Sequence, residues 1–490
     1  MNKYLLTIDL GASNGRGIVF AYDGSGMKPV YEHRFANEIA LLRGTAYWDI
    51  LYLFQNIKTA IRDAAHRFEI SSIGIDTWGL DFGLIGYDGN LMENPVAYRD
   101  KRTDGIMDVL YQQLPQRDLY FMTGTQCLPG NTIYQLYYLL KNRPELLDRT
   151  KKILMMPDLM TYFLTGETHT EFTIASTMQL MQMDQRTWNY ELLDRIGLSQ
   201  EKLTDMIYPG EQAFALSRDL QQELGVHNIP VVSVASHDTA SAVISIPTLD
   251  EESLYISSGT WSIIGTERSD PLIDETSYRG NYTNEGGFGK TIRYAKSLVG
   301  LWLIQECVRC WKEAGITIGY SEIEDQVRQV QPFMSIIDPQ DAALQNKCDM
   351  PREIARLCEQ NHQHIPETVG EFARCIYESM ALNYRRSVEI LKQQTGRAYS
   401  QLYVVGGGSR ASFLNQCIAD ATGITVVAGM PEATAYGNAF AQLYWGSDIA
   451  SIQDYRGMIR KNESNARIFI PQNTDAWEDT YSAFEQMSQA

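Results

Sequence analysis

Four short loops rich in glycine and hydroxyl residues follow apolar segments, and they are the first places in this sequence where a ligand could bind. They cover residues 11–16, 236–241, 257–260 and 406–409. Such loops leave backbone N–H groups open, and glycine lets the backbone approach a phosphate closely. A single loop of this kind is commonly just a tight turn. Four of them, each at the end of an expected strand, favour a nucleotide in a cleft between two halves of the chain.

Two acidic residues stand beside these loops. Asp9 lies where an apolar run meets the first loop, a place where a carboxylate can hold Mg²⁺ through water. The alternative for Asp9 is an Asx turn, in which the side chain caps its own loop. Asp238 follows another apolar run and precedes a small-residue segment typical of a helix start. It is either a helix N-cap or a base that takes a proton from a sugar hydroxyl.

Two further segments have side chains suited to a sugar. His237 directly precedes Asp238, and its ordinary alternative is a buried, hydrogen-bonded histidine. The sequence TWGLDFG at residues 77–83 mixes aromatic and polar groups after an apolar run. An aromatic ring can stack on the apolar face of a sugar, and Gly79 would let a ligand come close. The alternative for Trp78 is a core tryptophan near a turn.

Several familiar catalytic patterns are missing from the sequence. There is no Walker phosphate loop with its Gly-Lys-Ser/Thr ending, and no G-x-S-x-G nucleophile elbow. Cys358, His362 and His364 lie close together, but they lack the paired spacing of zinc sites. We therefore expect neither a P-loop enzyme, nor a serine hydrolase, nor a zinc protein.

The elements that must carry these residues alternate between strands and helices, which indicates the α/β class. Apolar segments flank the loops at 11–16 and 257–260, so each loop is expected to join a β-hairpin. Further strands are expected at residues 73–76, 228–234 and 401–405, and an amphipathic helix over residues 372–391 ends at Gly396. Two similar hairpins half a chain apart indicate two related halves, and the polar stretch at 247–252 is the expected boundary.

Composition limits the class of partner. The chain has 490 residues, enough for two large domains, and its net charge is −18 from 42 basic and 60 acidic residues. Such a surface repels nucleic acid and anionic membranes, although backbone N–H groups can still bind an anionic ligand locally. No segment approaches the roughly 20 apolar residues of a membrane helix, and no signal peptide is apparent. We expect a cytoplasmic protein whose partners are small molecules, and we leave its oligomeric state open.

The motifs together resemble those of the FGGY carbohydrate kinases. The similarity rests on DLGASNGR at residues 9–16, GIDTWG at 74–79, SHDTASA at 236–242, SSGTWS at 257–262 and VGGG at 405–408. The motifs AYRD at 97–100 and NYTNEGG at 281–287 extend the similarity, which covers nearly the whole chain. Single loops of this kind are shared by many kinases, whereas the set in this order is specific.

The resemblance implies two ribonuclease-H-like, actin-like halves with ATP and a sugar in the cleft between them. Residues 1–247 would form the sugar-binding domain with the catalytic base, and residues 248–490 the nucleotide-binding domain. The implied reaction transfers the γ-phosphoryl group of ATP to O1 of L-rhamnulose, with Mg²⁺ as cofactor. Two alternatives stay open: a kinase for another ketose, such as fuculose or xylulose, and an actin-like ATP-binding protein without kinase activity.

The same resemblance implies roles for individual residues. Asp238 would be the catalytic base, and Asp9 would place Mg²⁺ through water. The sugar would contact Gly79, His237, Asp238 and Thr239. The phosphates and the rest of the nucleotide would contact Ala12, Ser13, Asn14, Gly15, Arg16, Thr260, Gln305 and Gly407.

Two positions depart from the patterns of related kinases. Gly79 and Leu80 stand where glycerol kinases carry an Arg-Glu pair, which argues against glycerol because its hydroxyls need those polar partners. At Ser297 an asparagine that touches the ligand would be expected. A serine is shorter, so this contact would need a bridging water.

Overall fold

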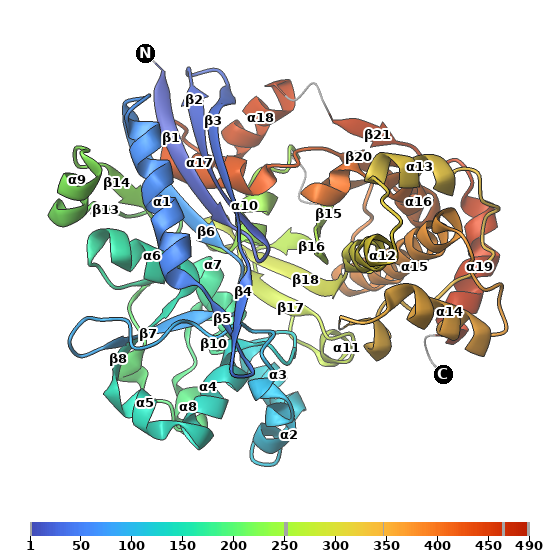
Figure 1. The fold of residues 1–490 in the computed structure, drawn as a ribbon, viewed down its shortest axis with the longest axis horizontal. Helices are drawn as coiled ribbons and strands as arrows, with labels where there is room; N and C mark the ends of the chain where they lie inside the picture. Colours follow the sequence, from blue (N-terminus) through green and yellow to red (C-terminus); the bar gives the residue numbers. More distant parts are fainter. Residues whose placement is uncertain (1, 249–252, 346, 463–465, 488–490) are drawn as a thin grey trace. The chain divides into compact units, whose positions relative to one another are not determined.

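A computed structural model describes residues 2–248, 253–345, 347–462 and 466–487 of the chain (Figure 1). Its residues group into two compact units. The first comprises residues 1–249, 267–294 and 433–462, and the second comprises 250–266, 295–432 and 463–490. The expected boundary stretch at 247–252 lies largely outside the described residues, and the assignment of domains 1–247 and 248–490 stays a prediction. All seven cysteines are free thiols.

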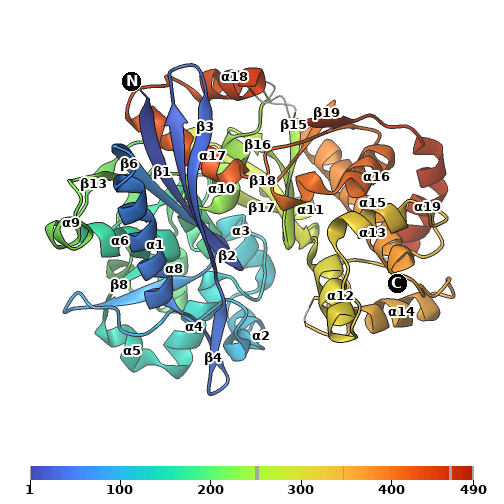
Figure 2. The ribbon, with the colours of Figure 1, turned by 45° about the horizontal axis from the view of Figure 1, so that its top comes forward.

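The first unit is built on a six-stranded sheet with the order β13-β14-β6-β1-β2-β3 (Figure 2). Strands β1, β2 and β3 form an antiparallel meander, and β6 pairs in parallel with β1. The strands are β1 Lys3–Leu10, β2 Asn14–Tyr22, β3 Met27–Ala36, β6 Ile70–Thr77, β13 Ala213–Ala215 and β14 Pro230–Val232. The first expected hairpin is thereby confirmed, and the strand expected at 228–234 is real but shorter.

Successive side chains of β1 point alternately to the two faces of this sheet, so the two faces differ in polarity. Leu6, Ile8 and Leu10 join an apolar core with helix α1 (Ile50–Ala65), whose buried side chains recur at helical spacing. The intervening residues, including Asp9, point to the opposite face. There α17 (Ala433–Trp445) packs on β1 and β6, and its Asn438 and Gln442 bond to both strands. The Asp9 carboxylate therefore lies on the face of the sheet that is covered by α17 and its polar side chains.

The rest of the first unit surrounds this sheet with small ribbons and helices. A second apolar core, which includes Phe82, Leu136 and Leu192, lies among them. The additional strands are β4 Ile39–Leu42, β5 Thr45–Trp48, β7 Phe82–Gly86, β8 Thr150–Met155, β9 Thr170–Glu171, β10 Met181–Gln182, β11 Thr187–Trp188, β12 Met206–Ile207 and β17 Thr283–Gly286. The additional helices are α2 Ile106–Tyr111, α3 Gln116–Thr123, α4 Thr132–Asn142, α5 Pro144–Arg149, α6 Met156–Thr165, α7 Phe172–Ala175, α8 Tyr190–Ile196, α9 Arg218–Leu224, α10 Asp238–Ile244, α11 Glu275–Arg279 and α18 Ile452–Asn462.

The second unit repeats the plan of the first. Its strands follow the order β18-β16-β15-β19-β20-β21 in a seven-stranded sheet whose remaining edge strand is β17, so the antiparallel hairpin β15–β16 again lies beside a parallel strand, β19. The strands are β15 Ser253–Ser258, β16 Trp261–Arg268, β18 Ile292–Val299, β19 Gln401–Val405, β20 Thr425–Ala428 and β21 Arg467–Phe469. Strand β16 ends after the last residue of this unit's first segment, and β18 begins before the first residue of its second segment. The common strand order confirms the expected relation between the halves.

Helices complete the second unit, and one of them was expected from its periodicity. The helix expected over 372–391 is α15, which extends further to Val369–Thr395 and ends at Gly396 with a left-handed φ of 66°. The others are α12 Trp302–Glu313, α13 Tyr320–Val327, α14 Met350–Gln360, α16 Ser412–Thr422 and α19 Thr474–Met487. Within the described ranges, no helix has the length and apolarity needed to cross a membrane.

Candidate active site

The first expected loop joins β1 to β2 and places Asp9 against Arg16. The two residues are direct neighbours in the antiparallel register, and the Arg16 Nη2 donates to Asp9 Oδ2 at 2.6 Å. The turn between them closes with a bond from the Gly11 N–H to the Asn14 carbonyl, while Ser13 and Asn14 are exposed. Ala12, Ser13, Asn14, Gly15 and Arg16 thus form one continuous hairpin end beside a carboxylate.

Asp76 is a second carboxylate at this place, and the sequence reasoning gave it no role. It pairs with Asp9 across the parallel β1–β6 register, so both side chains project to the same face. Burial, followed by the nearby charge of Asp9, raises the pKa of Asp76 well above its ordinary value. Asn438 donates to Oδ2 at 2.6 Å, whereas Oδ1 is buried without a hydrogen-bond partner among the described residues.

Asp238 lies on the same side of the first unit, at the start of α10. It is the first helical residue, and His237 occupies the N-cap position without a side-chain capping bond. The alternative that Asp238 is the helix N-cap is therefore wrong, because His237 occupies that position. Its side chain is 31% exposed, and Oδ1 accepts a bond from Thr239 Oγ1 at 3.0 Å. Desolvation raises the pKa of Asp238, His237 opposes this shift, and Asp9 adds to it.

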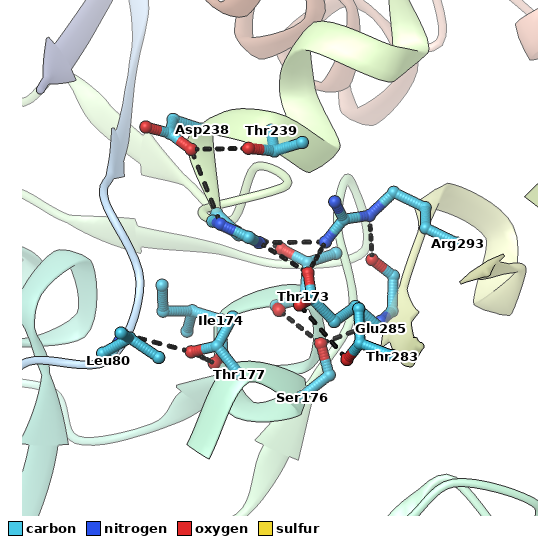
Figure 3. Close-up of polar contacts among 12 residues, drawn as sticks. Leu80, Thr173, Ile174, Ser176, Thr177, Asp238, Thr239, Thr283, Glu285 and Arg293 are labelled. Atoms are coloured by element: carbon cyan, nitrogen blue, oxygen red, sulfur yellow. Dashed lines mark hydrogen bonds and ion pairs between the residues drawn. The ribbon is translucent and has the colours of Figure 1, made fainter. Parts of the chain in front are cut away.

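A buried ionic cluster lies next to Asp238 (Figure 3). Arg293 on β18 donates from Nη2 to His237 Nδ1 and to Glu285 Oε2, each at 2.9 Å. Arg293 is fully buried, and its Nε also bonds to the Gly286 carbonyl. Burial raises the pKa of Glu285, but the charge of Arg293 opposes burial, and this pKa lies below its ordinary value. The cluster therefore contains a compensated Glu–Arg pair in contact with His237.

The backbone before Asp238 is held by Glu171. This buried carboxylate accepts bonds from the N–H and the hydroxyl of Ser236, at 3.0 and 2.6 Å. Thr173, which also bonds Glu171, accepts a bond from the His237 N–H at 3.1 Å. A loop fixed by three such bonds cannot shift without leaving buried polar groups unpaired. The position of Asp238 is thus set through Ser236 and His237, whose partners Glu171 and Thr173 lie 65 and 64 positions earlier in the chain, respectively.

The TWG segment leads directly from β6 to another buried carboxylate, Asp81. Asp81 accepts the indole N–H groups of Trp48 and Trp78 at 2.6 and 2.9 Å. Desolvation raises the pKa of Asp81 to about 6 despite these bonds. Trp78 is buried and its ring centroid lies 4.3 Å from that of Trp48, so the expectation of an exposed stacking ring is not met. The alternative, a core tryptophan, is the one observed.

Gly79 and Leu80 follow Trp78 and are only half-buried. A Cβ on Gly79 would lie 3.2 Å from the Thr177 side chain, which is closer than an ordinary contact. Leu80 has a φ of 78°, a strained conformation for a branched side chain, and its carbonyl accepts a bond from Thr132 Oγ1 at 2.6 Å. Strain of this kind at the end of a strand is a common feature of binding sites, because surrounding bonds must maintain it.

The second unit holds the two remaining expected loops close together. Thr260, in the turn between β15 and β16, donates to Gln305 Oε1 of α12 at 3.1 Å. Gly406 has a left-handed φ of 78°, and a Cβ on Gly408 would lie 2.0 Å from Ser258 Oγ. The 406–409 loop therefore reaches the 257–260 loop only because glycine occupies these positions. Gly407 lies between Gly406 and Gly408, at the start of a short 3₁₀ helix.

The expected site residues thus form two groups. Asp9, residues 12–16, Gly79, His237, Asp238 and Thr239 belong to the first unit, and Thr260, Gln305 and Gly407 belong to the second. Sequence reasoning overlooked Asp76, Glu171 and the Glu285–Arg293 pair. The one available signal was the similarity between IDLG at 8–11 and IDTW at 75–78, which places an aspartate at the end of two apolar strands.

The oxygen atoms of Asp9 and Asp76 suit a magnesium ion. Mg²⁺ prefers oxygen ligands and usually keeps several waters, with one or two carboxylates and substrate phosphates as its other ligands. The unpartnered buried Oδ1 of Asp76 is one acceptor of this kind. In the described part of the chain, no group of three His, Cys, Asp or Glu residues is arranged to hold a metal. The residues therefore fit an ion bound mainly through water and phosphate.

Two protein-family models match successive parts of the chain. The family model "FGGY family of carbohydrate kinases, N-terminal domain" matches residues 4–245, and the corresponding C-terminal domain model matches residues 254–445. The rhamnulokinase of Bacteroides thetaiotaomicron is 39% identical, with 99% of each chain covered. The rhamnulokinase of Bacillus subtilis is 36% identical, with 96% of this chain and 95% of the relative covered.

Solved structures show the same fold at much lower identity. A ligand-bound xylulose kinase from Lactobacillus acidophilus superposes with a TM-score of 0.83 at 16% identity, and 99% of this chain and 98% of that one are covered. Glycerol kinase of Plasmodium falciparum with ADP gives a TM-score of 0.80 at 16% identity, covering 100% of this chain and 98% of that one. These structures confirm the two-domain α/β fold of the actin-like type. With both family models and near-full-length relatives in agreement, the chain belongs to the FGGY family of carbohydrate kinases.

Proposed function

We propose that this protein is an L-rhamnulose kinase, which transfers the γ-phosphoryl group of ATP to O1 of L-rhamnulose. The observation that carries the proposal is the near-full-length similarity to rhamnulokinases, at 39% and 36% identity. The geometry around Asp238 supports a kinase independently, because a partly exposed carboxylate whose pKa is raised by desolvation accepts a proton more readily than an ordinary aspartate.

Asp238 is the proposed base. Its carboxylate would accept the proton of the O1 hydroxyl as that oxygen attacks the γ-phosphorus in line. Phosphoryl transfer depends mainly on positioning and charge stabilisation, and a general base adds about 10²–10⁴-fold. Because Glu171 and Thr173 hold the backbone of residues 236 and 237, Asp238 needs little reorganisation before reaction.

The β1–β2 hairpin end is the proposed phosphate-binding element. Backbone groups of residues 12–15 and the Arg16 guanidinium would bind phosphate oxygens, so an acidic protein would bind ATP through local groups. Asp9 would hold Mg²⁺ through water, and Arg16 keeps that carboxylate in place. When bound, the ion would neutralise charge on the phosphates during transfer.

The loops of the second unit are the proposed nucleotide-binding element. Thr260 and Gln305 form a bonded pair that would contact the nucleotide. Gly407 would do so through its backbone, because a side chain would obstruct close approach. We accordingly assign sugar binding and the base to a domain of residues 1–247, and nucleotide binding to a domain of residues 248–490.

Gly79, His237 and Thr239 are the proposed sugar contacts beside Asp238. Gly79 offers backbone rather than charged groups, which suits a ketose better than glycerol. Thr239 already donates to Asp238 and would share its hydroxyl with the sugar. Ser297 on β18 replaces the asparagine expected at that position, so its contact would need a bridging water. Use of ATP by a carbohydrate kinase supports a cytoplasmic location.

The substrate is tested by comparing ketoses with purified protein. ADP release would be measured with L-rhamnulose, L-fuculose and xylulose at fixed ATP and Mg²⁺. We expect the highest kcat/KM for L-rhamnulose, because discrimination resides in transition-state binding to the sugar hydroxyls. A clear preference for either other ketose would refute the specific substrate and leave a kinase of the family. No sugar-dependent ADP release from any of them would favour an ATP-binding protein without kinase activity.

A further inference from the structure

The hydrogen-bond geometry around His237 determines which of its ring nitrogens carries the proton. Arg293 Nη2 lies 2.9 Å from His237 Nδ1, and an arginine nitrogen can only donate. Nδ1 must therefore accept, which places the proton of the neutral ring on Nε2. If Nδ1 carried a proton, its N–H would point at the Arg293 N–H across that short distance.

The other contacts of Arg293 are consistent with this assignment. One hydrogen of Nη2 is directed to His237 and the second to Glu285 Oε2, also at 2.9 Å. Glu285 Oε2 lies farther from His237 Nδ1, at 3.4 Å. The arginine and the glutamate neutralise each other within the protein interior, so the cluster does not require a charged histidine. His237 itself is buried, with 6% exposure.

The protonated nitrogen of His237 faces the proposed base. Nε2 lies 3.5 Å from Asp238 Oδ1, the same oxygen that accepts the Thr239 hydroxyl at 3.0 Å. Thr239 therefore bonds Oδ1 directly, whereas His237 Nε2 faces the same oxygen at an ion-pair distance. Since the side chain is 31% exposed, Oδ2 is the oxygen left to accept a proton from substrate.

We propose that Arg293 and Glu285 are positioning residues that fix His237 in its Nε2–H form, so that His237 and Thr239 anchor Asp238 Oδ1 and leave Oδ2 as the proton acceptor. This inference rests on the proposed function for the role of Asp238, but the tautomer itself is a property of the protein without substrate. Neither Arg293 nor Glu285 need touch the sugar. Their effect passes through His237.

The tautomer can be observed directly by NMR of protein labelled with ¹⁵N only at histidine. The chain has seven histidines, and His237→Gln identifies the signals of His237 by their loss. We expect one protonated nitrogen, Nε2, and one unprotonated nitrogen, Nδ1, at neutral pH. A proton on Nδ1, or on both nitrogens, would overturn the proposal whether or not the enzyme phosphorylates L-rhamnulose.

Variants of Arg293 separate positioning from a merely structural role. Arg293→Met removes the donor and leaves Glu285 as the neighbour of Nδ1, so we expect the proton to move to Nδ1 or both nitrogens to be protonated. We expect kcat to fall by about 10- to 100-fold with little change in the KM for ATP. Arg293→Lys keeps a donor and should preserve the Nε2–H form and recover part of kcat.

A matched control variant removes a contact to Oε1 of Glu285, the carboxylate oxygen that Arg293 does not contact. Thr283→Val deletes the 3.4 Å bond to Glu285 Oε1 and leaves the Arg293 and His237 contacts in place. This variant should keep both the tautomer and kcat. Equal loss of kcat in Thr283→Val and Arg293→Met, with an unchanged tautomer in both, would show a structural role and refute the proposal. If Arg293→Met does not fold, the wild-type and Arg293→Lys spectra still decide the question.

Discussion

Asp238→Asn should lower kcat by about 10²–10⁴-fold while ATP binding is preserved, because the amide cannot take the proton of the attacking hydroxyl. The substitution keeps the shape of the side chain and its acceptor for Thr239 Oγ1. Sugar-dependent ADP release gives kcat, and calorimetric titration gives ATP affinity. Asp219→Asn, the same change at an exposed position on α9, should leave both unchanged.

The pH dependence of wild-type protein and Asp238→Asn tests the assignment of Asp238 as the base. Burial raises the pKa of Asp238, so the fraction of ionised base falls as pH decreases through that raised value. Wild-type kcat/KM should therefore decline on the acid side, and the residual activity of Asp238→Asn should lack that decline. Near-normal turnover in the variant, or an identical acid limb, would remove Asp238 as the base.

Gly437→Ala should destabilise the first unit strongly, because helix α17 passes against α10 at this glycine. An added Cβ would lie 1.8 Å from the Ser241 carbonyl oxygen, a backbone atom that cannot rotate away. Separation of the two helices would cost about 1–3 kcal/mol or more. It would also move α10, which begins with Asp238, so we expect kcat to fall along with the urea midpoint of unfolding.

Gly457→Ala supplies the matched control for this change. Gly457 also lies within a helix, α18, but an added Cβ would meet no atom within 4 Å. The alanine should raise the free energy of unfolding by about 0.5–1 kcal/mol, since glycine loses more backbone freedom on folding. Equal unfolding midpoints for Gly437→Ala and wild type would contradict the close helix contact.

Local patterns were enough to predict much of the fold. The hairpins around residues 11–16 and 257–260 and the helix ending at Gly396 follow from apolar runs, turn residues and helical spacing, all of which act over a few residues. The strand expected at 228–234 is reduced to Pro230–Val232, because its last residues leave the sheet to form the loop before α10. Such endings depend on tertiary contacts.

The candidate site could be predicted only where its residues are adjacent in sequence. Asp9, His237 and Asp238 stand beside recognisable loops, whereas Asp76 gains its importance from pairing with Asp9 and from Asn438, which is 362 positions away. Arg293 reaches His237 across 56 positions. For Trp78 the sequence left open a stacking ring or a core residue, and its N–H bonds to buried Asp81, a contact that residue type alone does not reveal.

The most direct test of the central claim is the position of the phosphate in the product. The protein would be incubated with ATP, Mg²⁺ and L-rhamnulose labelled with ¹³C at C1, and the product examined by ¹³C and ³¹P NMR. We expect stoichiometric formation of ADP and a sugar phosphate whose C1 signal is split by phosphorus. A phosphate on another carbon, or ADP release without any sugar phosphate, would contradict it.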